Sequence, residues 1–338
     1  MPTLALILES STTPSASRSI DRALLARATV EGRGTLRVSR FAGDVLGLGR
    51  WHLAPRGAPG VELHRRLSGG RATATGAGFV HVSLTLPHRS ALVSGDPLAL
   101  APEQVLNRAV RGVLGGLEAG GLPALYPGRD LLTVAGRPLA VLGFEVDATG
   151  ATLVETVLAV ERDQSLLPAL LDRADPDGIV AAPMTLPNDV TSVARALGRA
   201  PSFDELVTWI RHGYETRLGI AFTADAPPAA GDGDGAFVQS RARRSDLDRR
   251  ARTSTMLGVF EAHCALDDAG RLREVMLAGD LLAPSRTVTR LEEAMRGCPA
   301  VVDRVMAVID RVVRAPGDFV LGVGPLRTIA ETIVEAAR

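Results

Sequence analysis

The segment from Arg65 to Gly78, Arg-Arg-Leu-Ser-Gly-Gly-Arg-Ala-Thr-Ala-Thr-Gly-Ala-Gly, carries the residue types best suited to binding an anion. Glycines let the backbone approach a ligand closely and adopt positive φ. Backbone N–H groups and arginines suit a carboxylate or a phosphate, because charge-assisted hydrogen bonds are strong and the guanidinium binds two oxygens at once. The same pattern also describes an ordinary glycine-rich turn, so the surrounding sequence has to decide between the two interpretations.

The composition restricts the chemistry further. The chain of 338 residues contains no lysine, so all 38 of its basic residues are arginine, a bias that a GC-rich genome produces. No step can therefore use a lysine ammonium, Schiff base or general base. The formal net charge is zero, which gives no general attraction to nucleic acid or to an anionic membrane. The length favours about two domains, and the hydrophobic content of 46% is ample for their cores.

Cysteine content and the first residues indicate the compartment. Cys264 and Cys298 are the only cysteines, too few for a disulfide framework or a cysteine-rich zinc site, and we expect no metal centre. The apolar run over residues 4–8 is short and lacks preceding basic residues, so it predicts a first strand rather than a signal peptide. No apolar run is long enough to span a bilayer. We therefore expect a cytoplasmic protein that does not associate with membranes.

Strands predicted on both sides of the glycine-rich segment would position it. Residues 78–86 alternate apolar and polar side chains and predict a strand leaving that segment. Residues 35–41 and 45–48 predict a strand pair, and 130–144 predict two strands around a turn at Gly136. Further strands are predicted over 151–160, 258–266 and 273–278.

Helices are predicted from capping patterns and apolar spacing. Ser202-Phe-Asp-Glu205 is a capping box that opens a helix to about Tyr214, and Thr289-Arg-Leu-Glu292 predicts a second such helix ending near Gly297. Apolar residues at helical spacing predict three more helices, over 19–27, 101–117 and 301–313.

The chain divides at a segment rich in proline, glycine and aspartate, residues 225–235, which predicts a linker. The arginine-rich stretch that follows, 241–252, fits a solvated crossing between domains better than a nucleic-acid patch, because Asp246 and Asp248 interrupt it and it holds no aromatic residue. We predict a larger α+β domain over 1–224, a linker over 225–254 and a small β-β-α-α domain over 255–338.

Four blocks, in this order and spacing, resemble the lipoate–protein ligase A family of the biotin/lipoate A/B protein ligase superfamily. Residues 37–52 resemble its Arg…Trp…Gly…Gln block, and 65–78 resemble its RRxSGGGAVxHDxGN signature, followed by Ser83 where the family often has a serine. Residues 126–139 resemble its RNDLxVxGKKIxG block, and 258–280 with the helices that follow resemble its small accessory domain. The resemblance covers nearly the whole chain.

The resemblance implies a fold and an activity. The fold would be a biotin/lipoate-ligase-like domain, with a mixed or antiparallel sheet and helices, plus a small α+β C-terminal accessory domain. The family's enzymes form lipoyl-AMP from ATP and lipoate, or the octanoyl equivalent, and a lysine of a lipoyl domain then takes the acyl group. The resemblance thus implies ATP with Mg²⁺ and lipoate or octanoate as ligands and a lipoyl-domain acceptor as partner.

Matched position by position, the resemblance also implies binding residues for the acyl-adenylate. Arg66 would contact the ligand, Ser68, Gly69 and Gly70 would form the loop around it, and Gly78 belongs to the same signature. Asp130 would face the adenylate end, although as a residue before a strand it fits a turn equally well.

The departures from the family pattern concern its chemistry. The family's active-site lysine corresponds to Pro138, which has no side-chain donor and no backbone N–H. The third glycine of the signature is Arg71, the asparagine of the RND motif is Arg129, and Phe79 stands in place of the signature's final asparagine. The family's His-His-Gly-Thr strand is here Leu-Val-Glu-Thr, residues 153–156. We assign no catalytic residue.

Two main hypotheses follow, beside a third and weaker one, a new reaction on the same fold, since a fold does not fix a function. The protein is a ligase of this family in which arginines such as Arg66, Arg71 or Arg129 supply the missing charge, or it is a non-catalytic pseudoenzyme that binds an acyl group or a lipoyl-domain partner. His81, in mid-strand, is more readily explained as a hydrogen-bonded core histidine than as a catalytic one, and His52 as a hydrogen-bonding substitute for the family's glutamine.

Overall fold

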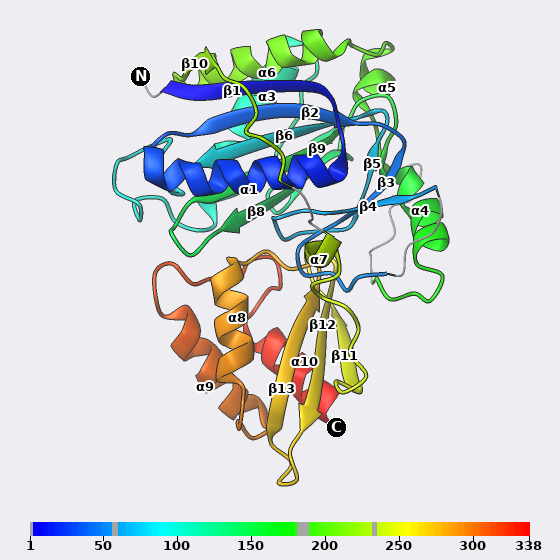
Figure 1. Ribbon diagram of the computed structural model, residues 1–338, viewed down its shortest axis with the longest axis vertical. Coiled ribbons are helices and arrows are strands. Elements are labelled where there is room, and N and C mark those ends of the chain that lie inside the picture. Colours follow the sequence, from blue (N-terminus) through cyan, green and yellow to red (C-terminus); the bar gives the residue numbers. More distant parts are fainter. Residues whose placement is uncertain (1–2, 56–59, 181–188, 232–234) are drawn as a thin grey trace.

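The computed structural model describes residues 3–55, 60–180, 189–231 and 235–338, which form a larger upper unit and a smaller lower one (Figure 1). A seven-stranded mixed sheet in the order β10-β1-β2-β6-β9-β8-β7 organises the upper unit. In it β1 runs parallel to both β10 and β2, and the pairs from β2 to β7 are antiparallel. Its strands are β1 (Thr3–Thr12), β2 (Thr35–Phe41), β6 (Phe79–Leu86), β7 (Leu131–Val134), β8 (Arg137–Val146), β9 (Thr152–Ala159) and β10 (Ala221–Ala224).

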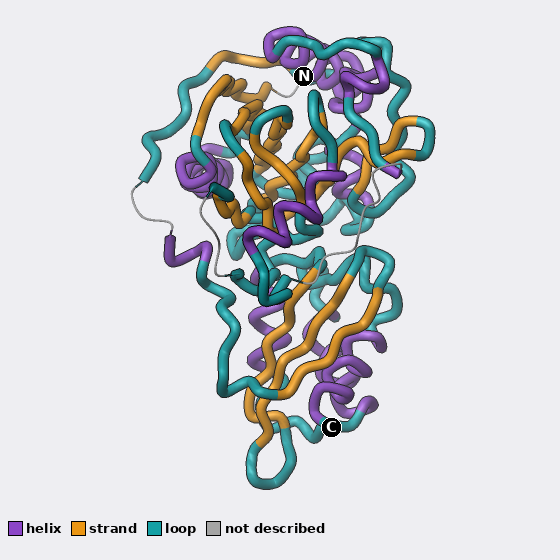
Figure 2. The backbone as a smooth tube through the Cα atoms, turned by 90° about the vertical axis from the view of Figure 1, so that its right-hand side faces the viewer, coloured by secondary structure: helices purple, strands orange, loops and turns teal. Residues whose placement is uncertain are grey.

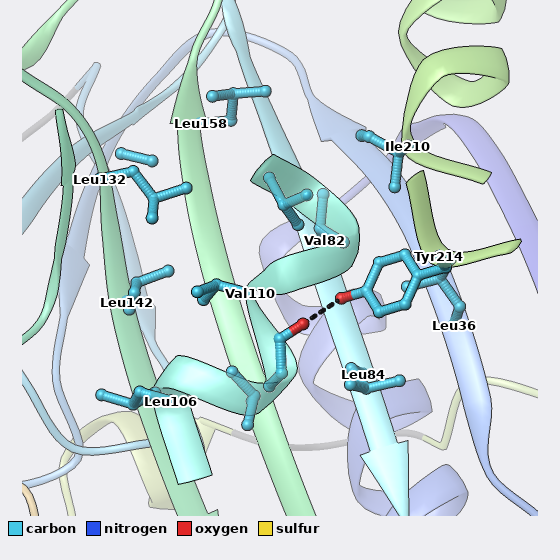
Figure 3. Close-up of a cluster of buried hydrophobic side chains, with 14 of the residues drawn as sticks. Leu36, Val82, Leu84, Leu106, Val110, Leu132, Leu142, Leu158, Ile210 and Tyr214 are labelled. Carbon is cyan, nitrogen blue, oxygen red and sulfur yellow. Dashed lines mark hydrogen bonds between the residues drawn. The ribbon is translucent and has the colours of Figure 1, made fainter. Parts of the chain in front are cut away.

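The two faces of this sheet differ in polarity, because side chains alternate along each strand. One face carries apolar residues such as Leu36, Val82 and Leu142, which pack against the helices on that side (Figure 3). The Tyr214 hydroxyl completes this core by donating to the Ala109 carbonyl at 2.9 Å (Figure 3). These helices are α2 (Gln104–Ala109), α3 (Arg111–Ala119) and α6 (Phe203–Leu218).

The opposite face of the sheet is covered by α1 (Pro14–Glu31), which crosses the front of the sheet in Figure 1. A small second sheet, in the order β4-β3-β5, lies beside it and carries the glycine-rich segment between two of its strands. The elements of this side are β3 (Asp44–Leu48), β4 (Glu62–Arg65), β5 (Thr73–Gly76), α4 (Leu167–Ala174) and a 3₁₀ turn η1 (Gln164–Leu166). The short helix α5 (Val193–Leu197) packs with the apolar core of the other face.

The lower unit is a three-stranded antiparallel sheet, β11-β12-β13, backed by three helices (Figure 2). Its apolar core includes Phe260, Val288, Ile309 and Ile333. Its elements are β11 (Arg249–Ser254), β12 (Val259–Leu266), β13 (Leu272–Gly279), α8 (Ser285–Ala294), α9 (Val302–Val313) and α10 (Arg327–Ala337); the four-residue helix α7 (Gly235–Val238) lies in the connection from the upper unit.

The predicted α+β architecture is confirmed, and several predicted elements differ in detail. The predicted strand pair of 35–41 and 45–48 is wrong: β2 and β3 form at nearly those residues but belong to different sheets. The helix predicted over 101–117 is divided at Val110 into α2 and α3, and α1 extends well beyond 19–27. The capping box at Ser202 is present, with both of its hydrogen bonds.

The second predicted capping box, at Thr289, is wrong because α8 begins four residues earlier, at Ser285. No α8 side chain caps this start; instead the carboxylate of Glu145, on β8 of the other unit, accepts from the Ser285 N–H at 3.0 Å. A tertiary contact of this kind leaves no signal in the local sequence. The lower unit also exceeds the predicted β-β-α-α pattern by β11 and α10.

The strand β11 falls within residues 225–254, the predicted linker. All its residues pair with β12, so this part of the predicted linker belongs to the sheet of the lower unit. The domain boundaries at 224 and 255 themselves stay a prediction. Among the helices of the described ranges, none combines the length and the apolar composition that crossing a membrane would require.

Candidate functional site

The glycine-rich loop rests directly on the polar face of the large sheet. A Cβ added at Gly143 of β8 would lie 2.4 Å from both the Ser68 hydroxyl and the Gly69 carbonyl oxygen. Only a glycine at this sheet position allows such a close approach. The sequence therefore brings the loop and the sheet together at one point, as the predicted binding site requires.

The N–H groups of the loop are engaged inside the protein. The Ser68 N–H donates to the Glu155 carboxylate at 2.8 Å, and the Gly69 N–H to the Phe144 carbonyl at 3.2 Å. The Gly70 N–H donates to the carbonyl of Leu281, in the lower unit, at 2.9 Å. The three donors expected to cradle a ligand anion thus already have acceptors.

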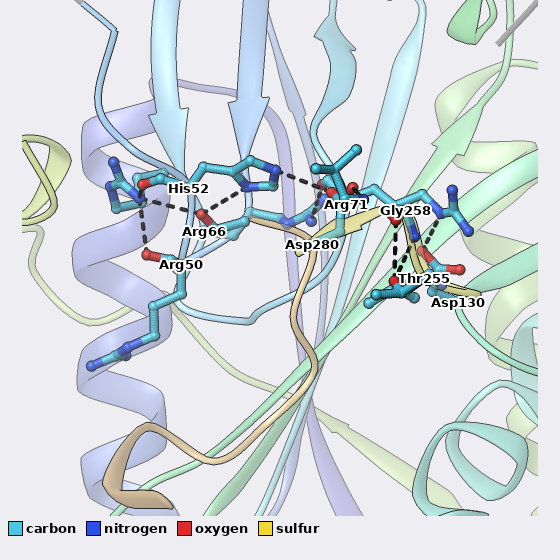
Figure 4. Close-up of polar contacts among 12 residues, drawn as sticks. Arg50, His52, Arg66, Arg71, Asp130, Thr255, Gly258 and Asp280 are labelled. Atoms are coloured by element: carbon cyan, nitrogen blue, oxygen red, sulfur yellow. Dashed lines mark hydrogen bonds and ion pairs between the residues drawn. The ribbon is translucent and has the colours of Figure 1, made fainter. Parts of the chain in front are cut away.

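The lower unit lies against the loop so tightly that only glycine fits. A Cβ at Gly69 would meet the Leu281 carbonyl oxygen at 2.1 Å, and Gly70 has a φ of +101°. Two neighbouring contacts strengthen this seam: the Gly279 N–H donates to the Trp51 carbonyl at 3.1 Å, and His52 Nε2 lies 3.1 Å from Asp280 Oδ1 (Figure 4). His52 has the hydrogen-bonding role that the sequence predicted.

The two adjacent arginines of the loop differ in their roles. Arg65 is fully buried and donates to the carbonyls of Arg50 and His52 at 2.9 and 2.6 Å, so it holds the neighbouring backbone in place. Arg66 is also buried, and its Nη2 donates to the Arg71 carbonyl at 2.7 Å. Its Nε and Nη1 atoms are buried without a hydrogen-bond partner. Burial lowers the pKa of Arg66, and nearby carboxylates oppose that shift.

Asp130 is fully buried and forms an ion pair with Arg71, whose Nε lies 2.6 Å from its Oδ2 (Figure 4). Burial raises the pKa of Asp130, and the charge of Arg71 works against the shift. Asp130 also precedes β7, and its carbonyl accepts from the Leu142 N–H of β8 at 2.8 Å, which continues the pairing of these two strands. The arginine that replaces the signature's third glycine therefore occupies the carboxylate predicted to face an adenylate.

Other positions singled out in the sequence have structural roles. Gly78 turns the chain into β6 with a φ of +84°, and Arg162 fills the space beside its Cα atom. Phe79 is buried in the core beneath the small sheet. Pro138 lies half-buried on β8, and its carbonyl accepts from the Thr191 N–H at 3.0 Å.

Beneath the loop, a row of polar side chains crosses the sheet. Arg37 of β2 is in register with Ser83 of β6, which is in register with Glu155 of β9, and all three are buried. Asp21, on α1, lies above the row: Arg37 Nη1 donates to its Oδ1 at 3.1 Å and the Ser83 hydroxyl to its Oδ2 at 3.3 Å. We call this group, together with Arg66 and Ser68 of the loop, the sheet-face cluster.

The sheet-face cluster has two buried carboxyls near buried guanidinium groups. Burial raises the pKa of both Asp21 and Glu155, and Arg37 and Arg66 partly offset the two shifts. Arg37 also forms an ion pair with Glu9 of β1. When the carboxyls are protonated, the cluster keeps two guanidinium charges that favour an anion.

His81 lies next to this row and is held in place by its neighbours. Its Nε2 is 2.6 Å from the Thr75 hydroxyl, and its ring lies 4.1 Å from that of Phe41. Burial, together with the charges of Arg37 and Arg66, lowers the pKa of His81 to about 3. It is therefore a neutral core histidine near pH 7, in agreement with the structural interpretation made from the sequence.

Several buried polar atoms of this region have no hydrogen-bond partner, which is uncommon in folded proteins. Three of them are guanidinium nitrogens, Arg37 Nη2 and Arg66 Nε and Nη1. Others are the hydroxyl oxygens of Ser39, Ser68, Thr73 and Thr85. Sequence reasoning missed Asp21 and Glu155 as site residues. The period-two pattern of residues 152–159 could have placed Glu155 on one face with Ser83, but only packing brings Asp21 there.

The residues present do not fit ATP with Mg²⁺. The loop donors already have acceptors in the protein, Arg71 holds Asp130 through its Oδ2, and the chain has no lysine. Within the described ranges, no group of three or more histidine, cysteine or acidic residues is placed to hold a metal ion. No nucleotide-dependent step follows from this arrangement.

Comparison with known proteins agrees with the fold. No protein-family model matches the sequence, and no curated protein does. Among solved structures, P. falciparum LipL1 in complex with lipoate is 10% identical, with a TM-score of 0.65 over 98% of this chain and 99% of that one. Lipoate-protein ligase A bound with ATP is 18% identical, with a TM-score of 0.52 over 71% of this chain and 94% of that one. A bi-partite lipoate protein ligase from Thermoplasma acidophilum, solved with its E2 lipoyl domain, is 17% identical, with a TM-score of 0.53 over 71% and 91%.

These identities are low, so the likeness concerns the fold. The fold predicted from the four sequence blocks, that of the lipoate–protein ligases, is confirmed.

Proposed function

We propose that this protein is a lipoate-ligase-like binding protein that holds an acyl carboxylate, such as that of lipoate or octanoate, without activating it with ATP. One observation carries the proposal. The loop's N–H groups are engaged within the protein and Asp130 pairs with Arg71 through its Oδ2, whereas Arg66 and Ser68 present buried donor atoms that have no partner. The backbone donors of the expected site are therefore occupied, and side-chain donors that could bind a carboxylate are unused.

A carboxylate complements these atoms chemically. Arg66 Nε and Nη1, Arg37 Nη2 and the Ser68 hydroxyl can all donate to its oxygens. Burial raises the pKa values of Asp21 and Glu155, so the negative charge that would repel an anion weakens as the pH falls. The choice of lipoate or octanoate rests on the likeness to a structure that contains lipoate.

A lipoyl domain is the partner that fits this proposal. The structure from Thermoplasma acidophilum pairs a ligase of the same fold with an E2 lipoyl domain. A protein that holds the acyl group without activating it would act on such a domain by docking or by delivering a ligand, not by forming the amide bond.

A ligase that uses arginine is the second candidate, and one observation favours it. Of the three arginines considered as replacements for the lysine, Arg71 binds Asp130, and Arg129 is exposed and donates to the Met256 carbonyl. Arg66 alone of these three has buried donors without a partner. It could stabilise a developing negative charge electrostatically.

Incubation with ATP, lipoate or octanoate and an apo lipoyl domain separates the two candidates. We expect mass spectrometry to show neither acyl-adenylate nor acylated domain, and calorimetry to show binding of octanoate but not of ATP. Acylated domain whose formation is lost in the Arg66→Gln variant would establish the ligase instead. Arg296, exposed on the lower unit, provides the control variant Arg296→Gln. Thermal unfolding of both variants verifies that they are folded.

A further inference from the structure

A cavity separate from the sheet-face cluster lies where α1, the glycine-rich loop and the start of α8 meet. Its volume is about 370 Å³, within the range of small-molecule sites. Leu67 of the loop faces it, whereas the neighbouring Arg66 and Ser68 belong to the sheet-face cluster. The remaining lining combines an apolar wall of Leu25, Ala26 and Phe237 with a polar side formed by Arg22, Arg50, Glu145, Asp147 and Ser285.

Glu145 provides an unusual group in this cavity. Its side chain is only 1% exposed, and its Oε1 accepts from the Ser285 N–H at the start of α8. Its Oε2 is buried without a hydrogen-bond partner, with Arg50 Nη1 3.7 Å away. A buried carboxyl oxygen left in this state is costly unless a ligand or a proton satisfies it.

Arg50 provides the positive charge. Its Nη1 donates to the Leu67 carbonyl at 3.4 Å, and its guanidinium lies 5.5 Å from the centre of the Phe237 ring. In the described ranges, its Nε and Nη2 atoms have no hydrogen-bond acceptor in the protein. Arg22 lies over the same ring at 5.1 Å. A guanidinium with two uncommitted donor atoms beside an apolar wall is suited to a carboxylate on an apolar body.

We propose that this cavity binds a small organic monocarboxylate with an apolar body, whose carboxylate pairs with Arg50 and accepts a hydrogen bond from the protonated Glu145 side chain. The apolar body would lie against Leu67 and Phe237. One carboxylate satisfies both the uncommitted guanidinium donors and the unpartnered carboxyl oxygen. This site is independent of the function proposed above, because it uses none of the atoms of the sheet-face cluster.

The proton on Glu145 gives the site a pH dependence with a defined sign. Burial raises the pKa of Glu145 to about 7, and the charge of Arg50 works against the shift. The charged groups that face this side chain are Arg50, in the turn after β3, Arg22, on α1, and Asp147, directly after β8. Glu145 is protonated below about pH 7 and can donate to the ligand, so binding should weaken as the pH rises through 7.

Benzoate and its neutral isostere benzamide provide the test. The chain has two tryptophans, Trp51 and Trp209, and the Trp51 ring lies 5.4 Å from the Arg50 guanidinium. In a Trp209→Phe background, Trp51 fluorescence therefore reports on the surroundings of Arg50. We expect benzoate to change the fluorescence saturably and benzamide not to, with an affinity about tenfold higher at pH 6 than at pH 8 because one proton is taken up.

Three variants complete the test. Arg50→Gln should weaken benzoate binding about tenfold or more, and Glu145→Gln should keep binding but remove its pH dependence, whereas Arg296→Gln should bind as the parent does. Equal binding of benzamide, or unchanged binding in Arg50→Gln, would overturn the proposal. If Arg66→Gln abolishes benzoate binding and Arg50→Gln does not, the ligand lies in the sheet-face cluster, so this site fails while the proposed function stands.

Discussion

The glycine-rich loop and the sheet face beneath it are in direct contact, yet they satisfy their polar groups in different ways. The loop's N–H groups have acceptors in Glu155, Phe144 and Leu281. The sheet face contains buried ions that pair with one another and donor atoms that have no partner. Two of the three loop donors fix the loop to the sheet, and the third, the Gly70 N–H, joins it to the lower unit. The unused donors lie on the side chains below, where we propose that a carboxylate binds.

The largest loss in the free energy of unfolding should come from replacing Arg37, the central cation of the sheet-face cluster. Arg37→Met would leave Asp21 buried without its cation and remove the partner of Glu9, and breaking a buried pair from one side costs about 3–5 kcal/mol. Chemical denaturation should show this loss against Arg40→Met, a half-buried position on the same strand, which we expect to cost about 1 kcal/mol or less.

The loss in Arg37→Met should also depend on pH in a defined direction. The charge of Arg37 lowers the pKa of Asp21, so its removal raises that pKa further above the unfolded value. A carboxyl with a raised folded-state pKa destabilises the protein as the pH rises through that value. The variant should therefore be closer to the wild type at pH 5 than at pH 8. Equal losses at both pH values would mean that Asp21 is not the group left unpaired.

The contact between the glycine-rich loop and the lower unit should show the next largest loss of stability on substitution. In Gly69→Ala the new Cβ would meet the Leu281 carbonyl oxygen at 2.1 Å, so the lower unit has to move away from the loop. Overpacking of this kind costs about 1–3 kcal/mol. The matched control is Gly95→Ala, because that glycine has nothing within 4 Å of an added Cβ.

Hydrogen exchange locates the effect of Gly69→Ala. We expect faster exchange of the Gly70 and Gly279 amides, which donate across the seam, and unchanged exchange in β12, within the lower unit. If Gly69→Ala and Gly95→Ala unfold alike, the loop is not held by the lower unit and its N–H groups are available to a ligand.

The sequence predicted elements that depend on local signals and missed contacts between distant parts of the chain. Alternation over residues 79–86 and the capping box at Ser202 are local signals, and both elements formed as predicted. The start of α8 was misplaced because its cap is Glu145, 140 positions away. For the site, the loop residues were found from their resemblance to a family, but not the occupation of their N–H groups. Two of their three acceptors, at Phe144 and Leu281, are backbone carbonyls, which any residue type supplies, and the third, the Glu155 carboxylate, comes from a distant strand.

The smallest expected change in stability concerns Arg129, in the turn directly before Asp130. Arg129 has a φ of +65°, a left-handed conformation that asparagine tolerates better than arginine, and asparagine is the residue expected there from the family pattern. Arg129→Asn should relieve this strain but lose the hydrogen bond to the Met256 carbonyl at 3.2 Å. Because the loss offsets part of the gain, we expect a net stabilisation of only about 0.5 kcal/mol. Thermal unfolding measures the shift against Arg137→Asn, an exposed strand position without positive φ, which should not gain stability. A loss of stability in Arg129→Asn would show that the contact with Met256 outweighs the strain, so that this arginine, like the glycine loop, serves to join the two units.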